Sequence, residues 1–373
     1  MMIIGFDAKR AFWNRRGLGN YSRDLIRLMQ QYFPDNQYVL FTPKRKNAPF
    51  NPDSQGAVSV QPSALIDRMM PSLWRSLTMN RDIRRQHVDI YHGLSQELPF
   101  GIHAAAVKTV VTIHDAIFIR YPELYDSVYR TVFTQKNRYS CHVSDRIVAI
   151  SEQTKHDCIE FFGADEDKID VVYQGCSSVF RDTVTADEIN QVRHKYGLPK
   201  QFLLSVGAIE RRKNMGIILD AIYKGNIDMP LVIVGGKTAY FAELAKKIAS
   251  YSLQNRVLFL HQAAFADFPA IYHAASCMIY PSLFEGFGLP ILEALCTELP
   301  VITSKGGCFD ETGGDAAFYI DPLNVDELVD AIQQVLSDSI LQKDMKKKGL
   351  HHAELFTDEH VAHNMMQVYS KLV

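Results

Sequence analysis

Two glutamates, Glu285 and Glu293, lie eight positions apart in the segment 282–294. A carboxylate accepts two hydrogen bonds, so it suits a vicinal diol such as the 2′- and 3′-hydroxyls of a ribose. A second carboxylate can hold sugar hydroxyls or stabilise a developing positive charge. The pair therefore predicts a sugar-nucleotide site. Spacing alone also fits an ordinary turn and helix with two solvated glutamates.

A strand, a loop and a helix are predicted to hold these glutamates. The apolar run 277–280 is typical of a buried strand. Gly286 and Gly288 allow the backbone to turn sharply, and Pro290 fits the first position of a helix. Such a loop presents backbone N–H groups above the sheet, and the positive end of the helix favours an anion or a row of hydroxyls.

The whole segment resembles a family signature. Glu285, seven intervening residues and Glu293, with Gly-Phe-Gly-Leu-Pro between them, are similar to the paired-glutamate motif of the retaining glycosyltransferases of family 4. The resemblance implies a GT-B architecture, in which two facing Rossmann-like α/β domains with doubly wound parallel sheets hold the active site in the cleft between them. It implies that Glu293 binds the donor ribose and that Glu285 acts at the transferred sugar. The loop residues implied to contact sugar and phosphate are Gly286, Phe287, Gly288 and Leu289.

A cationic turn follows the predicted strand 202–207. Arg212 and Lys213 lie there, where positive charge can neutralise a diphosphate, which is both a binding group and the leaving group of a nucleotide sugar. Family 4 enzymes carry similar cations, so the resemblance implies that both residues bind the donor. The chain departs from the family at Ala208, where an arginine is common, and Arg211 is a candidate substitute. An exposed basic turn is the alternative interpretation.

His114 and Asp115 follow an apolar run at the end of the predicted strand 109–114. Ligands of parallel sheets bind past the carboxyl ends of the strands. His114 could donate a hydrogen bond to a sugar hydroxyl or move a proton near neutral pH, and the resemblance implies contact with the reacting sugar. Asp115 is a candidate to orient His114 or to position the acceptor. Considered alone, a histidine at a strand end is more often structural.

A segment rich in arginine and glycine separates the first predicted strand, 2–6, from a helix expected to begin near Asn20, which could cap it. The glycines at 17 and 19 do not match the dinucleotide fingerprint, because Ser22 occupies the third glycine position and the motif starts ten residues after the strand. The segment instead resembles the flexible glycine-rich loop of family 4 enzymes. Candidate contacts are Gly17 and Gly19 for the donor and Arg15 and Arg16 for the acceptor.

Two domains are expected from the length of 373 residues and an ordinary globular composition, 47% apolar and 22% charged. Short buried strands alternate with helical stretches, which is typical of parallel sheets. We expect an acceptor-side domain over 1–180, completed by a helix over 357–373, and a nucleotide-sugar domain over 181–356. The expected strands are 2–6, 37–42, 88–92, 109–114, 146–150, 168–173, 202–207, 231–234, 257–260, 277–280, 301–303 and 318–320.

Charge is nearly balanced overall, with a formal net charge of −2, which argues against a nucleic-acid partner. Residues 1–120 are basic, with 16 cationic and 9 anionic side chains. Within them the segment 65–86 combines an apolar stripe with several arginines. It is either a helix packed on the sheet with a solvated basic face or a peripheral contact with an anionic membrane. The stripe contains Leu65, Ile66, Met69, Leu73 and Leu77, with Trp74 beside it.

The six cysteines have no CxxC spacing and are expected to be reduced core residues. No run of 18 apolar residues and no signal-like start occur, so we expect a cytoplasmic protein, with peripheral association at the inner membrane face as an option. Neither a cofactor nor a metal is expected. The acidic triplet at 165–167 is not interpreted as a metal site, because it lies in a polar loop and fits a solvated turn.

These features predict a transferase that moves a sugar from a nucleoside diphosphate to a hydroxyl acceptor, and the resemblance implies retention at the anomeric carbon. The segments 4–10 and 210–214 look most like bacterial mannosyltransferases, so GDP-mannose is the preferred donor and a UDP-sugar the alternative. The expected acceptor is a glycan or lipid-linked oligosaccharide in cell-surface polysaccharide or lipopolysaccharide biosynthesis. Two other classes stay open: a catalytically silent scaffold, and another GT-B enzyme such as a sugar-nucleotide epimerase or a phosphorylase.

Overall fold

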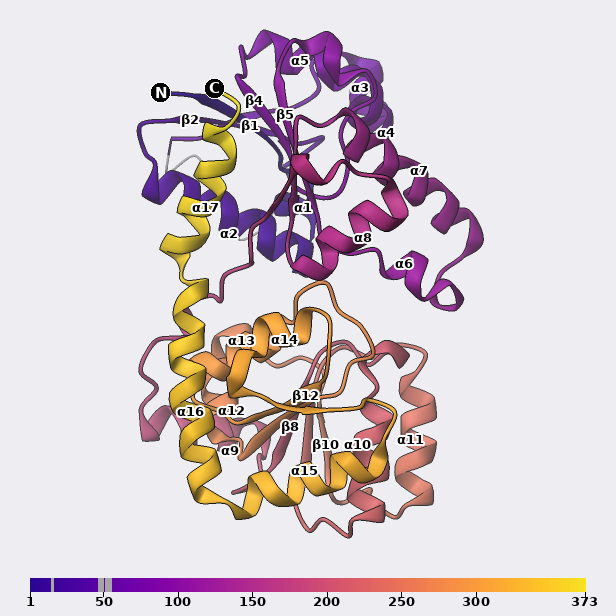
Figure 1. The fold of residues 1–373 in the computed structure, drawn as a ribbon, viewed down its shortest axis with the longest axis vertical. Coiled ribbons are helices and arrows are strands. Elements are labelled where there is room, and N and C mark those ends of the chain that lie inside the picture. The colour runs from indigo at the N-terminus through magenta and orange to yellow at the C-terminus, as the bar shows by residue number, and fades with distance from the viewer. Residues whose placement is uncertain (15–16, 46–49, 51–55) are drawn as a thin grey trace. The chain divides into compact units, whose positions relative to one another are not determined.

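The structure, a computed structural model, describes residues 1–14, 17–45, 50 and 56–373. The chain forms two compact units (Figure 1). Unit 1 contains Met1–Gln174 and Asp358–Val373, and unit 2 contains Gly175–Thr357. Each unit is one parallel β-sheet with helices packed against it, which confirms the predicted pair of doubly wound domains.

The sheet of unit 1 has the strand order β3-β2-β1-β4-β5-β6-β7, and all its pairings are parallel. The order reverses between β1 and β4, so the carboxyl ends of these two strands flank the crevice where doubly wound sheets bind ligands. The strands are β1 (Ile3–Asp7), β2 (Gln37–Phe41), β3 (Val58–Val60), β4 (Ile90–Gly93), β5 (Lys108–Ile113), β6 (Arg146–Ala149) and β7 (Ile169–Val171).

Several helices of different lengths cover this sheet. They are α1 (Lys9–Trp13), α2 (Gly17–Tyr32), α3 (Leu65–Met69), α4 (Pro71–Leu73), α5 (Met79–Arg85), α6 (Ile117–Arg120), α7 (Ser127–Val143), α8 (Glu152–Phe162) and α17 (Asp358–Ser370). A π-helical turn, η2 (Trp74–Thr78), lies between α4 and α5. The helix predicted over 65–86 is therefore broken into short pieces with a change of helical pitch in the middle.

Helix α2 begins three residues earlier than predicted. Its buried face includes the expected Tyr21 and Leu25. Asn20 lies inside the helix, where its Oδ1 accepts a hydrogen bond from Arg23 at 2.6 Å, so the prediction that Asn20 caps the helix is wrong. Gly17 and Gly19 consequently belong to the first turn of a helix and not to a flexible loop.

Helix α17 follows unit 2 in the sequence but packs in unit 1. Its Tyr369 hydroxyl lies 2.7 Å from His92 Nδ1 on β4, and Asp358 at its start forms a 2.9 Å ion pair with Arg27 of α2. Tyr369 is fully buried in the cluster that also contains Ile4 and Phe6 of β1. The last helix therefore completes the core of the first unit.

The sheet of unit 2 has the order β10-β9-β8-β11-β12-β13, again all parallel. Its strands are β8 (Leu203–Val206), β9 (Leu231–Val234), β10 (Val257–Leu260), β11 (Cys277–Tyr280), β12 (Val301–Ser304) and β13 (Phe318–Ile320). Its helices are α9 (Ala186–Tyr196), α10 (Met215–Lys224), α11 (Phe241–Ser250), α12 (Phe268–Ala274), α13 (Leu289–Cys296), α14 (Cys308–Gly313), α15 (Val325–Ser337) and α16 (Ser339–Ala353).

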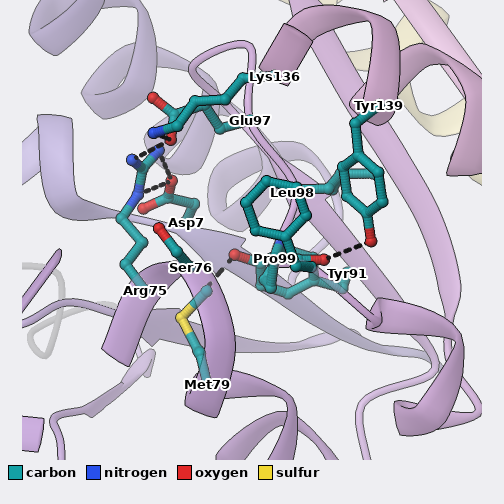
Figure 2. A pocket seen from close by; sticks show the side chains of 11 residues that line it. Asp7, Arg75, Ser76, Met79, Tyr91, Glu97, Leu98, Pro99, Lys136 and Tyr139 are labelled. Carbon is teal, nitrogen blue, oxygen red and sulfur yellow. Dashed lines mark hydrogen bonds and ion pairs between the residues drawn. The ribbon is translucent and has the colours of Figure 1, made fainter. Parts of the chain in front are cut away.

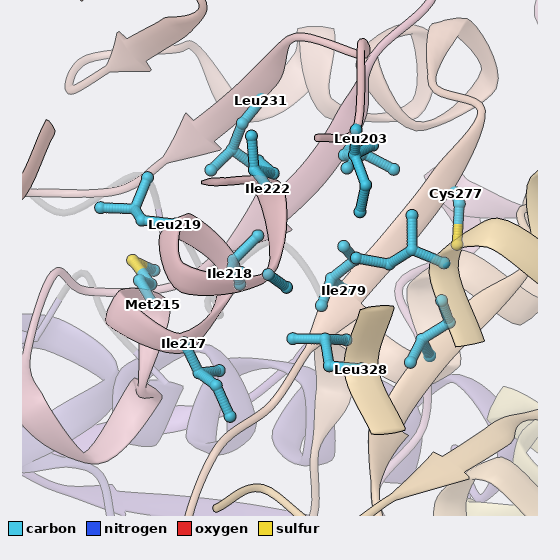
Figure 3. Close-up of a cluster of buried hydrophobic side chains, with 14 of the residues drawn as sticks. Leu203, Met215, Ile217, Ile218, Leu219, Ile222, Leu231, Cys277, Ile279 and Leu328 are labelled. Atoms are coloured by element: carbon cyan, nitrogen blue, oxygen red, sulfur yellow. The ribbon is translucent and has the colours of Figure 1, made fainter. Parts of the chain in front are cut away.

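The core of unit 2 explains why its strands could be predicted from the sequence. Strands β8, β9 and β11 are buried along their whole length, and their apolar side chains meet α10 and Leu328 of α15 (Figure 3). A strand covered on both faces shows a continuous apolar run. All six cysteines are buried and unpaired, which confirms their predicted role as core residues. Among the described helices, none has both the length and the apolar character needed to span a membrane.

Candidate active site

Glu285 is held by two cations at the carboxyl edge of the unit 2 sheet. Its Oε2 lies 2.7 Å from Arg212 Nη1, and its Oε1 lies 2.6 Å from Lys213 Nζ. The side chains of Glu285, Arg212 and Lys213 are only 10%, 12% and 11% exposed. The predicted cationic turn and the predicted glutamate loop therefore form one cluster. Because Arg212 and Lys213 are nearly buried, they do not form the exposed basic turn that was the alternative interpretation.

The Glu285 carboxylate is ionised in this setting. Burial by itself would raise the pKa of Glu285, but the attraction of Lys213 and Arg212 and the hydrogen bonds from both lower that pKa to about 2. A carboxylate this acidic is a poor proton carrier and a weak nucleophile at neutral pH. It instead fixes the positions of the two cations around it.

The backbone also joins the two loops. The turn Arg211–Lys213 follows β8, and the Arg212 carbonyl accepts a hydrogen bond from the Leu283 amide at 2.8 Å. Arg212 Nη1 also donates to the Phe284 carbonyl at 2.5 Å. The Tyr280 hydroxyl, at the end of β11, accepts from Lys213 Nζ at 2.7 Å. Tyr280 was predicted as a strand residue only, and its role as a lysine partner had no signal in the sequence.

The loop 286–289 leads into α13 as predicted. Gly288 has a φ of +100°, a backbone conformation that favours glycine, and Pro290 lies in the first turn of the helix. Phe287 is buried, and its carbonyl accepts a hydrogen bond from Thr312 Oγ1 at 2.5 Å. The hydrogen bond from Thr312 of α14 thus holds the loop in place. Leu289 is the first residue of α13.

Glu293 lies on α13 and has a different environment. Its Oε2 accepts a 2.5 Å hydrogen bond from the hydroxyl of Tyr272 on α12. Burial raises the pKa of Glu293 to about 7, although the Tyr272 hydrogen bond and the charge of Lys213 act in the opposite direction. The two glutamates of the motif thus differ in protonation near neutral pH. Tyr272 was not predicted as a site residue.

His114 lies at the end of β5 in unit 1 and is 4% exposed. Its Nε2 lies 2.9 Å from the Leu94 carbonyl, which can only accept, so Nε2 carries the proton and Nδ1 has the free electron pair. Burial lowers the pKa of His114 to about 4, against the Leu94 hydrogen bond and with a smaller effect from Arg10. The imidazole is therefore neutral near pH 7. Its Nε2 proton is donated to Leu94, and the predicted contact with the reacting sugar stays a prediction.

A buried polar network lies under His114 and was not predicted. The Tyr21 ring meets the His114 ring edge-on at 4.6 Å, and its hydroxyl lies 3.1 Å from Thr112 Oγ1. Thr112 is in turn 2.7 Å from His92 Nε2, and His92 Nδ1 is 2.7 Å from the Tyr369 hydroxyl. Four elements of unit 1 thus hold the surroundings of His114. The partners lie too far apart in the sequence for spacing to predict the network.

Of the remaining candidates in unit 1, Asp115 and Gly19 have structural partners. Asp115 Oδ1 accepts from the Ile117 amide at 3.1 Å, at the start of α6. A Cβ atom at Gly19 would lie 1.9 Å from the Asn14 carbonyl oxygen, so a glycine is needed there for α1 and α2 to approach each other. Gly17 has nothing within 4 Å of such an atom. Arg15 and Arg16 lie outside the described residues.

A second buried ion cluster lies at the carboxyl end of β1 (Figure 2). Arg75 of η2 pairs with Asp7 at 2.6 Å and with Glu97 at 2.8 Å, and Lys136 of α7 lies 3.2 Å from Glu97. The cluster links the sheet to two helices. Within the described ranges, no group of three or more His, Cys, Asp and Glu side chains is placed to hold a metal ion.

Comparison with known structures defines the class of protein. Over 100% of both chains, the protein superposes on Anabaena Alr3699/HepE, solved with UDP and glucose, with a TM-score of 0.78 at 19% sequence identity. Two parallel sheets with this arrangement of helices define the GT-B glycosyltransferase fold.

The sequence comparisons identify the family. Residues 15–178 match the model described as Glycosyltransferase Family 4, and residues 188–352 match Glycosyl transferases group 1. The O-antigen chain mannosyltransferase B of Escherichia coli is 30% identical over 289 residues, 76% of this chain and 74% of that protein. The O-antigen chain mannosyltransferase RfbU of Salmonella typhimurium is 26% identical over 234 residues, 60% of this chain and 62% of that protein. The chain belongs to the group 1, family 4 glycosyltransferases.

Proposed function

We propose that this protein transfers mannose from GDP-mannose to a hydroxyl group of a growing cell-surface glycan or lipid-linked oligosaccharide, with retention of the anomeric configuration. The observation that carries the proposal is the buried cluster in which Arg212 and Lys213 hold Glu285 beside the loop that begins α13. Support for mannose comes from the two O-antigen mannosyltransferases to which the chain is similar.

The cations suit the diphosphate of the donor. Lys213 Nζ donates to Tyr280 and Glu285, and an ammonium group has a third N–H to offer a phosphate oxygen. As the bond between sugar and diphosphate breaks, negative charge grows on the leaving group, and fixed cations stabilise it. Arg211 is a weaker candidate for the phosphate contact missing at Ala208, because it pairs with Glu243 at 2.7 Å.

Glu293 is proposed to bind the ribose. Oε2 already accepts from Tyr272, and the other carboxylate oxygen can accept from a ribose hydroxyl. Glu285 is proposed to contact the transferred sugar through its carboxylate while the neighbouring loop amides contact phosphate. Because Glu285 is ion-paired on both oxygens, we favour departure of the diphosphate and acceptor attack on the same face over a covalent glycosyl-enzyme.

His114 is proposed to accept a hydrogen bond from a sugar hydroxyl through Nδ1, because its Nε2 proton is used by Leu94. We propose that Asp115 and the arginines at 15 and 16 contribute to acceptor binding and that Gly17 and Gly19 line the donor phosphates. The protein is proposed to act in the cytoplasm without metal or cofactor, because Arg212 and Lys213 can supply the positive charge that the diphosphate requires.

Calorimetric titration with GDP, UDP, ADP and GDP-mannose in EDTA tests the donor. We expect GDP and GDP-mannose to bind, and a Glu293→Ala variant to lose at least about tenfold in affinity, as expected for a lost hydrogen bond of about 1.4 kcal/mol. Preferred binding of UDP would replace GDP-mannose by a UDP-sugar. Binding of none of the nucleotides would contradict the proposal and favour a silent scaffold.

Turnover assays separate transfer from the other classes. Retaining transfer requires release of GDP only when an acceptor glycan is present, and the product linkage keeps the donor configuration by NMR. Conversion of GDP-mannose without acceptor would indicate an epimerase. Absorbance of pyridoxal phosphate in the purified protein would indicate a phosphorylase.

A further inference from the structure

A groove on unit 1 lies between the neighbouring helices α6, α7 and α8 (Figure 1). It has a volume of about 400 Å³, which is within the range of small-molecule binding sites. The apolar side chains that line it come from α6, the turn after α6, and α8, whereas the polar ones come from α7. We call it the α7 groove, and the argument below uses Phe118, Ile119, Arg130, Thr134, Arg138 and Phe161 of its lining.

The polar wall of the α7 groove is one face of α7. Arg130, Thr134 and Arg138 are spaced four residues apart, which places them one above the other on a helix. Both arginines and the hydroxyl between them can donate hydrogen bonds. A second row at the same spacing adds two hydroxyls and an amide to this wall: Ser127, Thr131 and Gln135.

The two arginines have N–H groups available for a ligand. The Nε of Arg130 is buried, and it has no hydrogen-bond partner within the part of the chain that the structure describes. The Nε of Arg138 donates to the Phe161 carbonyl at 3.0 Å, and among the described residues no carboxylate pairs with either guanidinium. A buried donor without a partner costs free energy, so such groups in native proteins usually contact water or a ligand. Arg130 is therefore placed to bind a ligand in the groove.

The charge of the α7 groove favours an anion. Two arginines line it, and none of the described residues that line it is an aspartate or a glutamate. The carboxylates of Asp157 and Glu160 on α8 lie 2.5 Å and 3.4 Å from Arg120, which pairs with both. Asp126 caps α7 and accepts from the Val128 amide at 2.9 Å. The neighbouring carboxylates thus have partners outside the groove.

We propose that the α7 groove binds a phosphate group that is attached to an apolar body. A guanidinium donates two parallel hydrogen bonds to phosphate oxygens, and the α7 hydroxyls can bind the remaining oxygen. A carboxylate is a poorer match to this array of donors, because it has two oxygens where a phosphate has three. Phe118, Ile119 and Phe161 provide apolar surface for the rest of the ligand.

The position of the α7 groove has a consequence that rests on the proposed function. Helix α6 begins two residues after Asp115, and the Ile117 amide donates to Asp115 Oδ1 at 3.1 Å. The groove therefore follows, along the chain, the loop proposed to bind the acceptor. A lipid-linked acceptor has both a phosphate and an apolar chain, so we expect the groove to hold that end of the acceptor. Phosphate binding itself does not depend on the identity of the donor.

Calorimetric titration of the full chain with geranyl diphosphate, inorganic diphosphate and mannose 6-phosphate tests the inference. Excess GDP is present, because under the proposed function GDP occupies the donor site in unit 2 and leaves the α7 groove to the probes. We expect the parent protein to bind geranyl diphosphate. Arg130→Gln with Arg138→Gln should weaken this binding at least about tenfold, since hydrogen bonds from charged donors are lost.

The three probes distinguish two sources of the phosphate. Tighter binding of geranyl diphosphate than of the other probes would assign the ligand to a lipid-linked acceptor. Binding of mannose 6-phosphate that is equally tight or tighter would assign it to a free phosphate ester. The double glutamine variant should lose affinity in either case.

A matched control lies on α5 of the same unit. Arg84→Gln with Arg85→Gln removes two exposed arginines that do not line the groove, so the change in net charge is the same. This control variant should bind geranyl diphosphate like the parent protein. Thermal unfolding of each variant verifies that its fold is intact.

Three results would overturn the inference: no binding of any phosphate probe to the parent protein, an equal loss of affinity in the α5 control variant, or parent-like affinity in the Arg130 and Arg138 double variant. Nucleotide titration without the probes reports on the donor site separately. A chain that binds geranyl diphosphate through the two arginines but binds no nucleotide would contradict the proposed function and leave the α7 groove supported.

Discussion

Lys213 Nζ lies 2.6 Å from Glu285 Oε1, and the two side chains are only 11% and 10% exposed. These residues come from different loops, each following a central strand of the unit 2 sheet. A buried charge is costly unless it is paired, so each loop holds the other in place. The protein's own carboxylate therefore fixes the orientation of the cations of the proposed donor site.

Removing the lysine should weaken both the fold and donor binding. Lys213→Met leaves Glu285 with Arg212 as its remaining cation, so we expect a loss of about 1–3 kcal/mol in the free energy of unfolding by urea. Lys247→Met is the control, because Lys247 pairs with Asp220 at 2.6 Å but is 34% exposed. The Lys247→Met variant should lose less than about 1 kcal/mol in the free energy of unfolding. Equal losses for the two variants would show that Glu285 does not depend on Lys213.

The ion pairs of Glu285 should also make the free energy of unfolding depend on pH in the acid range. The pKa of Glu285 falls from 4.5 to about 2, so its ionisation stabilises the fold above about pH 4.5, and this contribution is lost as the pH falls toward 2. A Glu285→Gln variant lacks that contribution. The difference in unfolding free energy between parent and variant should therefore shrink on the order of 3 kcal/mol across this range. A difference that does not change with pH would mean that Glu285 has an ordinary pKa.

Donor binding should depend on the ionisation of Glu293. Its pKa is raised from 4.5 to about 7, so an ionised carboxylate that accepts ribose hydroxyls is available mainly above neutral pH. Nucleotide affinity should rise as the pH increases through about 7. The free energy of unfolding depends on pH in the opposite direction. Because the pKa of the Glu293 carboxyl is raised in the folded protein, stability falls as the pH rises from 4.5 to about 7.

Two variants separate the ribose role from a general effect of pH. Glu293→Gln should bind nucleotide more weakly and without this pH dependence. Tyr272→Phe removes a hydrogen bond that lowers the Glu293 pKa, so the rise in affinity should move to higher pH. A Glu293→Gln variant that keeps the parent pH dependence would assign the titration to another group.

His114 should stay neutral across the physiological range. Its lowered pKa of about 4 predicts imidazole NMR signals that do not shift between about pH 5.5 and 8. His114→Ala should reduce kcat while nucleotide affinity stays close to that of the parent. Titration of His114 near pH 6.5 would instead support the proton-transfer role predicted from the sequence.

Alanine substitutions at the two glycines that start α2 should have different effects on stability. Gly19→Ala places a Cβ 1.9 Å from the Asn14 carbonyl, so we expect a loss of about 1–3 kcal/mol in stability. Gly17→Ala has open space and removes an unfavourable helical glycine, so its stability should be unchanged or about 0.5–1 kcal/mol higher. Unfolding curves of the two variants provide the measurement. Unchanged stability in Gly19→Ala would rule out the close helix approach, and loss of nucleotide binding in Gly17→Ala would support a donor contact there.

Much of the fold could be predicted because many of its strands are continuous apolar runs. The expected strands at 231–234 and 277–280 match β9 and β11, which are fully buried, residue for residue, and 257–260 matches β10, an edge strand that is only partly buried. Strand β3 was missed, because it has only three residues and none is fully buried. The start of α2 was misplaced because glycine usually weakens a helix, whereas here it allows α1 and α2 to approach.

The candidate site was predictable only where its residues are close in sequence. Glu285, Gly288 and Pro290 identified one loop from local spacing. The ion pair with Lys213 joins residues 72 positions apart and depends on the strand order of the sheet. Trp74 was expected beside an apolar stripe, but the π-helical turn changes the helical periodicity and directs it inward. Tertiary context decides such cases, and the pattern of residue types does not contain it.

The return of α17 to unit 1 affects how the protein is made. Unit 2 is encoded as one uninterrupted stretch, so it can fold on the ribosome as soon as that stretch emerges. Unit 1, although translated first, lacks Tyr369 and the rest of α17 until the ribosome has passed through all of unit 2. The half of the chain that is synthesised first is therefore the half that completes its core last.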